Sequence, residues 1–309
     1  MSSKKPVNLA LTVDVEGEWF ELPGEQGSFD VIKILDALEN LEKLLDLIEF
    51  KVGTRIPVTW FIRCDDSVAA ITGKASGLLQ SLDNFISRRA ARFDEFGLHP
   101  HLYSFIGGKW TSEIDFNKQK EQIERAVIAW KSYFGSAPRL SRMGESVMKN
   151  TIAHTLSDLG LKIDSSALAC RKRCDSGFQF DWTGTPCSPY RPSTNDYRRP
   201  ANNGELRHSF IEIPFTMLSI KGSLDDKPIK RYCNLAFKPE VIQDAIWKTK
   251  QLGNIVALVH PHELLLKSHQ HHLIAYKPNS LEKNIENLSN ILGDLNFSLL
   301  SSFAHDVDK

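Results

Sequence analysis

The sequence predicts an α/β fold: a distorted (β/α) barrel of about seven parallel strands, in a single domain (residues 1–309) with an irregular insertion near residues 170–205. Short apolar runs alternate with longer stretches of helical periodicity, which is typical of a parallel sheet covered by helices. The roughly seven or eight units of this kind favour a closed barrel over an open doubly wound sheet. No glycine-rich phosphate loop follows the first apolar run, which argues against Rossmann and P-loop folds.

The predicted elements follow in order along the chain. Apolar runs predict strands at residues 7–13, 56–62, 93–98, 139–142, 161–163, 209–213, 255–259 and 297–300. Helical periodicity predicts helices at residues 29–50, 78–91, 116–133, 146–159, 239–251 and 281–292. In the first helix the apolar residues recur at three- and four-residue spacing: Ile32, Leu35, Leu38, Leu41, Leu45 and Ile48. Residues 170–205 are rich in Pro, Gly, Ser, Arg and Asn, so they predict an irregular connection in which a further strand can be hidden.

The composition excludes several classes of protein. Hydrophobic residues make up 41% and charged residues 25% of the 309 residues, which is an ordinary globular balance. Lys+Arg and Asp+Glu both total 38, so no net field attracts nucleic acid or an anionic membrane surface. No apolar stretch is long enough for a membrane span, and the N-terminal residues lack the features of a secretory signal, so we expect a cytoplasmic location. The five irregularly spaced cysteines are predicted to be reduced thiols.

Polar residues follow most of the predicted strands at their carboxyl ends. In parallel α/β folds the chemistry lies at these ends, which share one rim of the sheet. The polar residues at these positions are Asp14, Glu16, His99, His101, Arg142, Asp164, His260 and His262. The sequence therefore predicts a functional site at this rim.

His99 and His101 are candidate metal ligands. Residues two apart on an extended segment point to the same side, so both imidazoles can reach one ion. Pro100 between them favours an extended backbone. Neutral imidazoles together with a carboxylate suit Zn²⁺ or a similar divalent metal. Two structural histidines without a metal are the alternative.

Asp14 and Glu16 obey the same two-residue rule and can face one cavity together. One carboxylate can hold a metal while the other acts as general base, and which one does which stays open. A solvated acidic turn is the alternative.

Two further strand ends carry residues suited to acid–base catalysis. His260 suits a general acid, because the pKa of histidine lies near the working pH, and His262 is either its partner or exposed. Arg142 can orient a neighbouring carboxylate and keep it ionised, or lie at the surface.

Other residues have weaker functional interpretations. Asp164 can equally cap a helix or a turn. His269, His271 and His272 are expected in a solvated loop rather than in a metal-binding tract. Aromatic residues that could stack on a sugar ring, but more often lie in a core, are Trp19, Trp182 and Tyr190. Basic residues of the 170–205 connection that could meet phosphates, but more often form a solvated loop, are Arg171, Lys172, Arg173, Arg191, Arg198 and Arg199.

Five short motifs, in this order, resemble those of the polysaccharide deacetylases of the NodB-homology carbohydrate esterase family. They are Thr12-Val13-Asp14-Val15-Glu16, Pro57-Val58-Thr59-Trp60-Phe61-Ile62, Glu95-Phe96-Gly97-Leu98-His99, Arg142, and Leu258-Val259-His260. The segments Leu159-Gly160-Leu161 and Asp164-Ser165-Ser166 resemble a further strand region. The D-V-E and H-P-H variants resemble a branch associated with surface-glycan biosynthesis.

This resemblance implies a distorted (β/α) barrel, a divalent metal held by one acid and two histidines, and hydrolysis of N-acetyl or O-acetyl groups. By the same resemblance, Asp14 lies at the position of the catalytic base, His260 at the general acid and Arg142 at the arginine that tethers the base. Zn²⁺ is the metal we expect.

The chain departs from the family pattern at three places. Val15 replaces an aspartate that binds the metal, so either Glu16 takes over or metal binding is impaired. Tyr103 stands four residues after His99, where the family has its second histidine, so His101 is the natural substitute. Gly144-Glu145 replaces Pro-Tyr, and a backbone N–H near Gly144 is expected to stabilise the oxyanion.

The sequence thus predicts a metal-dependent deacetylase acting on carbon–nitrogen bonds. Its metal is held by Glu16, His99 and His101, and its substrate is an N-acetylated amino sugar in a surface-polysaccharide precursor, for example nucleotide- or lipid-linked. Nucleic acid is not expected as a partner. A glycan-binding barrel without catalysis and a hydrolase of a non-sugar amide are the alternatives.

Overall fold

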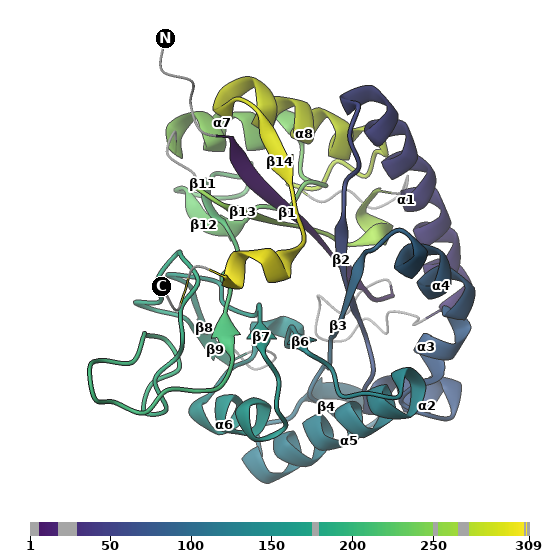
Figure 1. Cartoon of the computed structure of the whole chain (residues 1–309), viewed down its shortest axis with the longest axis vertical. Helices are drawn as coiled ribbons and strands as arrows, with labels where there is room; N and C mark the ends of the chain where they lie inside the picture. The colour runs from purple at the N-terminus through teal and green to yellow at the C-terminus, as the bar shows by residue number, and fades with distance from the viewer. Residues whose placement is uncertain are drawn as a thin grey trace.

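The computed structural model describes residues 6–17, 30–174, 179–249, 253–264, 272–305 and 307. Its centre is a curled sheet of parallel strands (Figure 1). The strands, in spatial order, are β10 (Ile211–Glu212), β7 (Ile163–Asp164), β6 (Leu140–Ser141), β3 (Glu95–Leu98), β2 (Val58–Ile62), β1 (Val7–Val15) and β13 (Ile255–Val259). The predicted fold class, a distorted (β/α) barrel with about seven parallel strands, is confirmed.

An eighth strand, β14 (Leu295–Phe297), extends the sheet beside the first half of β1. Leu9 pairs with Phe297 of β14 on one edge and with Ile255 of β13 on the other. Because β2 pairs with β1 only from Leu11 onward, β14 fills the edge that β2 leaves open. Leu9 of β1 therefore has a partner strand on both edges.

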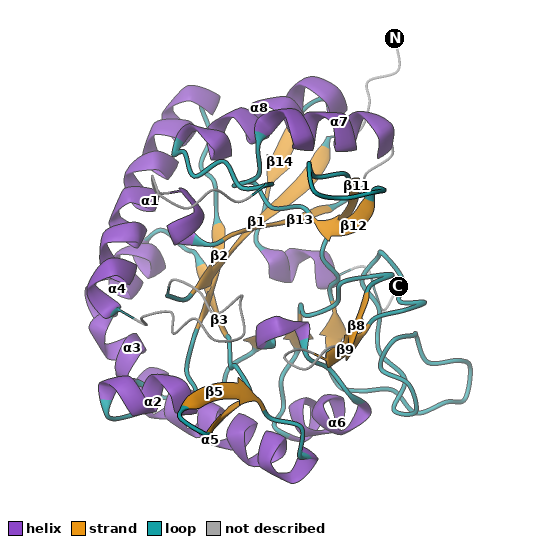
Figure 2. Cartoon of the chain, turned by 180° about the vertical axis from the view of Figure 1, so that it is seen from behind, coloured by secondary structure: helices purple, strands orange, loops and turns teal. Residues whose placement is uncertain are grey.

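The helices form the outer layer of the molecule, with α7 and α8 packed together beside β14 (Figure 1 and Figure 2). They are α1 (Val31–Val52), α2 (Asp66–Thr72), α3 (Gly77–Ser81), α4 (Asp83–Ala91), α5 (Phe116–Phe134), α6 (Asn150–Asp158), α7 (Pro239–Thr249) and α8 (Asn279–Leu292). The ends of α1 show why the chain is helical there. The side chain of Asp30 accepts hydrogen bonds from the first turn, and Gly53 ends the helix at φ 69°.

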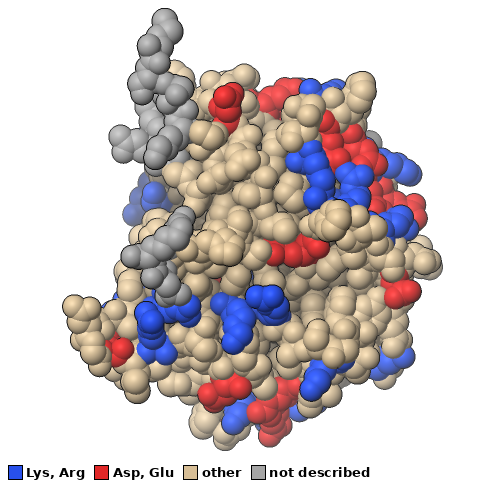
Figure 3. Space-filling view, in the orientation of Figure 1, with Lys and Arg blue, Asp and Glu red and all other residues tan. Residues whose placement is uncertain are grey.

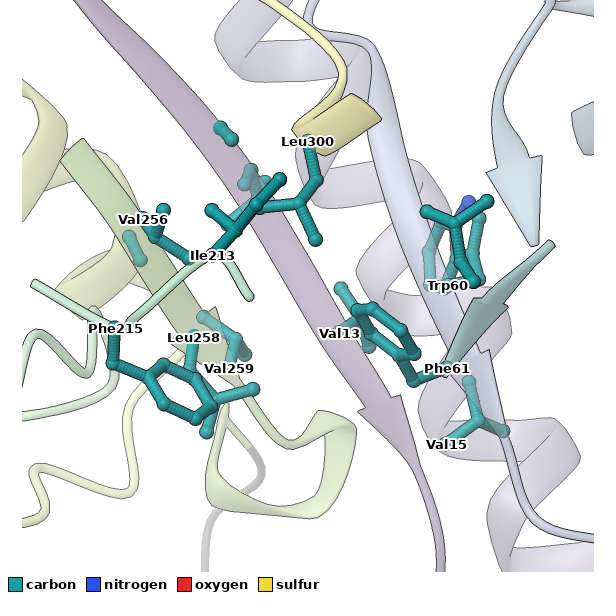
Figure 4. Packing of buried hydrophobic residues seen from close by; sticks show 14 of the residues in the cluster. Val13, Val15, Trp60, Phe61, Ile213, Phe215, Val256, Leu258, Val259 and Leu300 are labelled. Atoms are coloured by element: carbon teal, nitrogen blue, oxygen red, sulfur yellow. The ribbon is translucent and has the colours of Figure 1, made fainter. Parts of the chain in front are cut away.

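The core lies between the sheet and these helices. All five residues of β2 and of β13 are buried. Figure 4 shows Trp60 and Phe61 of β2 and Val256, Leu258 and Val259 of β13 together with Val13 and Val15 of β1. On its buried face α1 contributes Leu38, Leu41 and Leu45, at the spacing that the sequence predicts. Each fully buried large apolar side chain stabilises the fold by about 1.5–3 kcal/mol.

The barrel is closed by an irregular segment rather than by a strand ladder between β10 and β13. The N–H of Ile213 donates to the carbonyl of Asp164 (2.8 Å), so the chain leaves β10 along β7. The N–H of Thr216 then donates to the carbonyl of Val256 in β13 (3.2 Å), and the N–H of Val256 donates back to Thr216 Oγ1 (2.9 Å). This crossing is the distortion of the barrel.

Three antiparallel hairpins lie outside the predicted elements. Their strands are β4 (Tyr103–Ile106), β5 (Lys109–Ser112), β8 (Lys172–Cys174), β9 (Gln179–Asp181), β11 (Met217–Ile220) and β12 (Ile229–Tyr232). The hairpin of β8 and β9 lies within the irregular 170–205 region, where a hidden strand was possible. The predicted helix at 78–91 is two helices joined at Leu82, and the one at 146–159 begins only at Asn150.

The surface carries charges of both signs. Figure 3 shows Lys and Arg side chains interspersed with Asp and Glu over the face in view. Within the described ranges, no helix combines the length and the apolar character that crossing a membrane requires. All five cysteines are free thiols.

Candidate metal centre

The six predicted site residues line one cavity of about 320 Å³. They are Asp14, Glu16, His99, His101, Arg142 and His260. Four of them are the first residue after a strand: Glu16 after β1, His99 after β3, Arg142 after β6 and His260 after β13. Because these strands are parallel, their carboxyl ends bring the four residues to one rim.

Glu16, His99 and His101 converge on one point. Glu16 Oε2 lies 2.9 Å from His101 Nε2 and 3.6 Å from His99 Nε2, and the two Nε2 atoms are 3.2 Å apart. All three side chains are buried, and one potential ligand atom from each lies within 4.8 Å of the others. Asp14 is farther away, with Oδ2 4.0 Å from His99 Nε2.

The neighbours of the two histidines fix their orientation. His99 Nδ1 lies 2.8 Å from the carbonyl oxygen of Arg142, so Nδ1 carries a proton and donates it to that oxygen, while Nε2 points toward Glu16. The ring of His101 packs against Gly144, where a Cβ atom would come within 2.3 Å of the ring. Tyr103 packs on His101 from another side, with ring centroids 5.1 Å apart, and donates its hydroxyl to Glu145 (2.9 Å).

The donor set fits a divalent cation. Burial by itself raises the pKa of Glu16, but hydrogen bonds from His101 and His99 outweigh burial and hold this pKa well below its ordinary range. Burial and the nearby Arg63 lower the pKa of His101 to about 4, so this imidazole is neutral at neutral pH. One carboxylate oxygen and two imidazole nitrogens aimed at one point are the ligands that Zn²⁺ takes in proteins.

The pKa of His99 is shifted in the opposite direction from that of His101. Burial lowers it, but the carboxylates of Asp14 and Glu16 outweigh burial and raise it above the ordinary value. A metal ligand has to be the neutral imidazole, so a cation that binds here competes with protonation of His99. Metal binding is therefore expected to weaken in acid.

Arg142 holds Asp14 in place. Its Nη1 donates to Asp14 Oδ1 (2.7 Å) and to Thr12 Oγ1 (2.9 Å), while its Nε donates to the carbonyl of Ser165 (2.9 Å). The guanidinium is fully buried, so this is a charge-assisted hydrogen bond away from water. The second oxygen of Asp14, Oδ2, faces the imidazoles of His99 and His260 at 4.0 Å each.

Two aromatic rings enclose the guanidinium of Arg142. The rings of Phe61 and Phe215 lie 4.1 and 4.2 Å from its Cζ atom, and both residues are labelled in Figure 4. Such cation–π contacts stabilise a desolvated guanidinium by about 2 kcal/mol. Gly97 leaves room for Phe61, because a Cβ atom there would lie 2.5 Å from its ring.

His260 is paired with Glu263, which the sequence reasoning did not assign to the site. Glu263 Oε2 lies 3.1 Å from His260 Nδ1 and accepts the backbone N–H of His260 (3.1 Å). Asn234 donates to both oxygens of Glu263 (2.9 and 3.1 Å). Burial by itself lowers the pKa of His260, but the carboxylates of Glu263, Glu16 and Asp14 outweigh burial and raise it to about 10. The imidazole is therefore protonated, and its Nε2 faces Glu16 Oε1 at 3.3 Å.

Asp65 is a second carboxylate that the sequence reasoning missed. Its Oδ2 accepts the backbone N–H of His101 (3.2 Å) and the Nε of Arg63 (2.9 Å). Burial raises the pKa of Asp65, but Arg63 outweighs burial and lowers it to about 2. Two sequence features could have identified these carboxylates. Asp65 belongs to an Arg-x-Asp pattern directly after β2, and Glu263 lies three residues after His260.

Two backbone N–H groups near the expected oxyanion position are engaged within the fold. The N–H of Gly144 donates to the carbonyl of Pro100 (2.9 Å), and the N–H of Met143 donates to Ser166 Oγ (2.8 Å). These two N–H groups are therefore not available to hold an oxyanion. Gly144 is needed instead because the ring of His101 occupies the space of a side chain.

The structure also places several residues that have weaker functional interpretations in the sequence. Trp182 and Tyr190 are buried and lie outside the cavity lining, so they are core residues; Trp19 lies outside the described residues. Asp164 accepts the N–H of Ser166 (3.1 Å), as a turn residue does. His262 and His272 line the cavity, and His272 is half-buried in an irregular segment, while His269 and His271 lie outside the described residues.

Comparisons with known proteins support the fold. Neither protein-family models nor curated proteins match the chain. Among solved structures, a Mycobacterium smegmatis protein assigned as a polysaccharide deacetylase is 16% identical, with a TM-score of 0.52, over 100% of this chain and 93% of that protein. A Parabacteroides distasonis protein assigned as a glycoside hydrolase/deacetylase is 10% identical, with a TM-score of 0.63, over 97% and 71%. A Pseudomonas aeruginosa protein assigned as a polysaccharide deacetylase is 13% identical, with a TM-score of 0.53, over 96% and 89%. At these identities the likeness establishes a shared fold.

Proposed function

We propose that the protein is a metal-dependent hydrolase that removes an N-acetyl group from an amino sugar in a surface-polysaccharide precursor. The observation that carries the proposal is the convergence of Glu16, His99 and His101 on one point, at the rim of a fold shared with polysaccharide deacetylases. A divalent cation there, most plausibly Zn²⁺, would supply Lewis acidity toward the amide carbonyl and the attacking water.

Asp14 is the residue to which we assign the general base. Its Oδ1 is occupied by Arg142, so Oδ2, which faces the cavity, is the atom that takes the proton of the attacking water. The other donors of Arg142 are engaged by Ser165 and Thr12, so they are not available to the substrate. Arg142 acts as a positioning residue that fixes the carboxylate of Asp14.

His260 is the residue to which we assign the general acid. As the carbon–nitrogen bond breaks, its protonated Nε2 gives a proton to the leaving nitrogen, which departs as the free amine of the sugar. The acyl carbon, which has gained the water oxygen, leaves as acetate. Glu263 keeps the imidazole charged and oriented through Nδ1, so that Nε2 points into the cavity.

Acetate release tests this proposal directly. We expect the purified protein to contain about one divalent metal per chain and to release acetate from at least one member of a panel of N-acetylated nucleotide sugars and oligosaccharides. A chelator should abolish the release, and Zn²⁺ should restore it. Metal retention without acetate release would point to a glycan-binding barrel, and release from non-sugar acetamides alone would point to another amidase.

A further inference from the structure

Besides Arg142, three arginines line the same cavity as the candidate metal centre. They are Arg171 and Arg173, at the start of the hairpin of β8 and β9, and Arg231 in β12. None of the other basic residues that the sequence places in the 170–205 connection lines this cavity among the described residues. The cavity therefore has a cationic cluster in addition to its histidine and carboxylate cluster.

The contrast with the remaining basic residues of this connection shows that Arg171 is unusual. Lys172 pairs with Asp181 (3.4 Å), Arg198 with Asp196 (2.9 Å) and Arg199 with Glu205 (2.7 Å). Arg171, in contrast, makes no ion pair with any residue that the structure describes. Its Cζ atom lies 5.9 Å from the centroid of the Phe180 ring. The backbone N–H of Arg171 donates to the carbonyl of Leu168, and its carbonyl accepts the N–H of Trp182.

Arg231 is held rigidly toward the same space. Its guanidinium donates two hydrogen bonds to the carboxylate of Asp225 (2.8 and 3.0 Å) and a third to the carbonyl of Ile220 (3.1 Å). The side chain is only 15% exposed, although it lines the cavity. A largely buried arginine that is oriented by such hydrogen bonds is a pre-organised donor for a planar or tetrahedral anion.

The guanidinium groups of Arg171, Arg173 and Arg231 repel one another, so a bound anion would stabilise this cluster. Burial lowers the pKa of Arg171, and its neighbours Arg231 and Arg173 lower it further, while Tyr232 opposes them. Arginine keeps its charge nonetheless. Within the part of the chain that the structure describes, Arg171 makes no ion pair with the metal-site carboxylates or with Asp225, so they do not neutralise it.

We propose that the substrate carries an anionic group, a phosphate or a carboxylate, which binds Arg171 and Arg231 while its acetamido group lies at Glu16, His99 and His101. This inference rests on the proposed function and names its substrate class. A cavity of about 320 Å³ is within the range of small-molecule sites rather than of an extended polymer groove. One sugar ring with an anionic substituent fits both clusters at once.

Binding of three matched probes tests the inference without turnover. The probes are N-acetylglucosamine 1-phosphate, N-acetylmuramic acid and the neutral methyl N-acetylglucosaminide, measured by calorimetry at low salt. We expect one of the two anionic probes to bind at least about tenfold more tightly than the neutral one, and which of them does so identifies phosphate or carboxylate. The advantage should shrink as salt rises.

Variants locate the contact. Arg171→Gln should reduce the anionic advantage about tenfold, while the matched control Arg198→Gln, whose residue pairs with Asp196 outside the cavity, should bind as the wild type does. Equal binding of all three probes would overturn the inference. So would an anionic advantage that survives Arg171→Gln and disappears with His99→Ala, because the anion would then lie at the metal site.

Acetate release, measured in parallel, separates the two proposals. Turnover that is insensitive to Arg171→Gln overturns the anion subsite and leaves the proposed function standing. Anion binding that depends on Arg171 without any acetate release supports the subsite and contradicts the proposed function.

Discussion

The strand ends at the cavity and the short turns beside them differ in what they contribute. The ends of β1, β3, β6 and β13 carry the groups to which we assign chemistry, such as Asp14 and His260. The turns η1 (Gly144–Ser146) and η2 (Pro261–Leu264) carry residues that pack against or pair with those groups, namely Gly144 and Glu263. Strands bring residues that are distant in sequence to one rim, and turns set the orientation and charge of individual side chains there.

The two parts are also held differently. β1, β3 and β6 are fixed by parallel ladders on both sides, and β13 is fixed by its ladder with β1. In η1, Glu145 and Ser146 adopt φ values of 55° and 53°, which are unusual for residues with side chains. Such conformations persist where the surroundings require them. We therefore expect substitutions at strand ends to abolish catalysis and substitutions in the turns to weaken it.

Asp14→Asn should have the largest effect. The amide cannot accept the proton of water, so kcat should fall about 10²- to 10⁴-fold. Arg142 would then face a neutral group, so the free energy of unfolding should also fall, by up to about 3–5 kcal/mol. Steady-state kinetics and chemical denaturation check both effects, with the exposed Asp36→Asn on α1 as control. Unchanged kcat would remove Asp14 from the mechanism.

Gly144→Ala should act on the metal through His101. The added Cβ atom would meet the ring at 2.3–2.6 Å, so the imidazole has to shift. We expect metal affinity to fall about 10- to 100-fold with little change in secondary structure. Competition with a chromophoric chelator measures the affinity. Gly253→Ala is the matched control, since nothing lies within 4 Å of its Cβ position. Equal affinity in both variants would show that η1 does not support the site.

Glu263→Gln should have the smallest effect on rate and a specific effect on pH dependence. The pKa of His260 is raised to about 10, so its proton stabilises the folded chain fully below about pH 6.5 and this contribution is lost as the pH rises through about 10. Without Glu263 the folded pKa should fall, so the alkaline limb of kcat/KM should move to lower pH.

At pH 9 we expect Glu263→Gln to reduce kcat/KM about tenfold, with a smaller loss at pH 7. An NMR titration of the His260 imidazole checks the cause. Glu205→Gln, which removes a surface partner of Arg199, is the control. A pH profile that matches the wild type would mean that Glu263 is only structural.

The same division explains what the sequence could predict. Period-two spacing after an apolar strand is a local rule, so Asp14, Glu16, His99 and His101 could be found by spacing alone. The role of Gly144 depends on which segments of the fold meet, and no local pattern encodes that. The hairpins that carry Arg171 and Arg231 were missed because their strands are only three and four residues long.

The N–H of Gly144 shows why the sequence alone could not predict the hydrogen-bond partners at the site. Sequence reasoning could place a donor near the site, but the carbonyl of Pro100 takes that donor in the folded chain. Similarly, the helix predicted at 146–159 begins only at Asn150, because residues 144–146 form η1 instead. The first difference arises from a hydrogen bond between the segments that follow β3 and β6, which lie about forty residues apart in the sequence.

The central claim is that Glu16, rather than Asp14, completes the metal site with His99 and His101. Metal content and affinity of the wild type, Glu16→Gln and Asp14→Asn test it most directly. We predict that Glu16→Gln loses the bound metal while Asp14→Asn retains about one equivalent with reduced catalysis. Retention of metal by Glu16→Gln together with its loss from Asp14→Asn would contradict the claim.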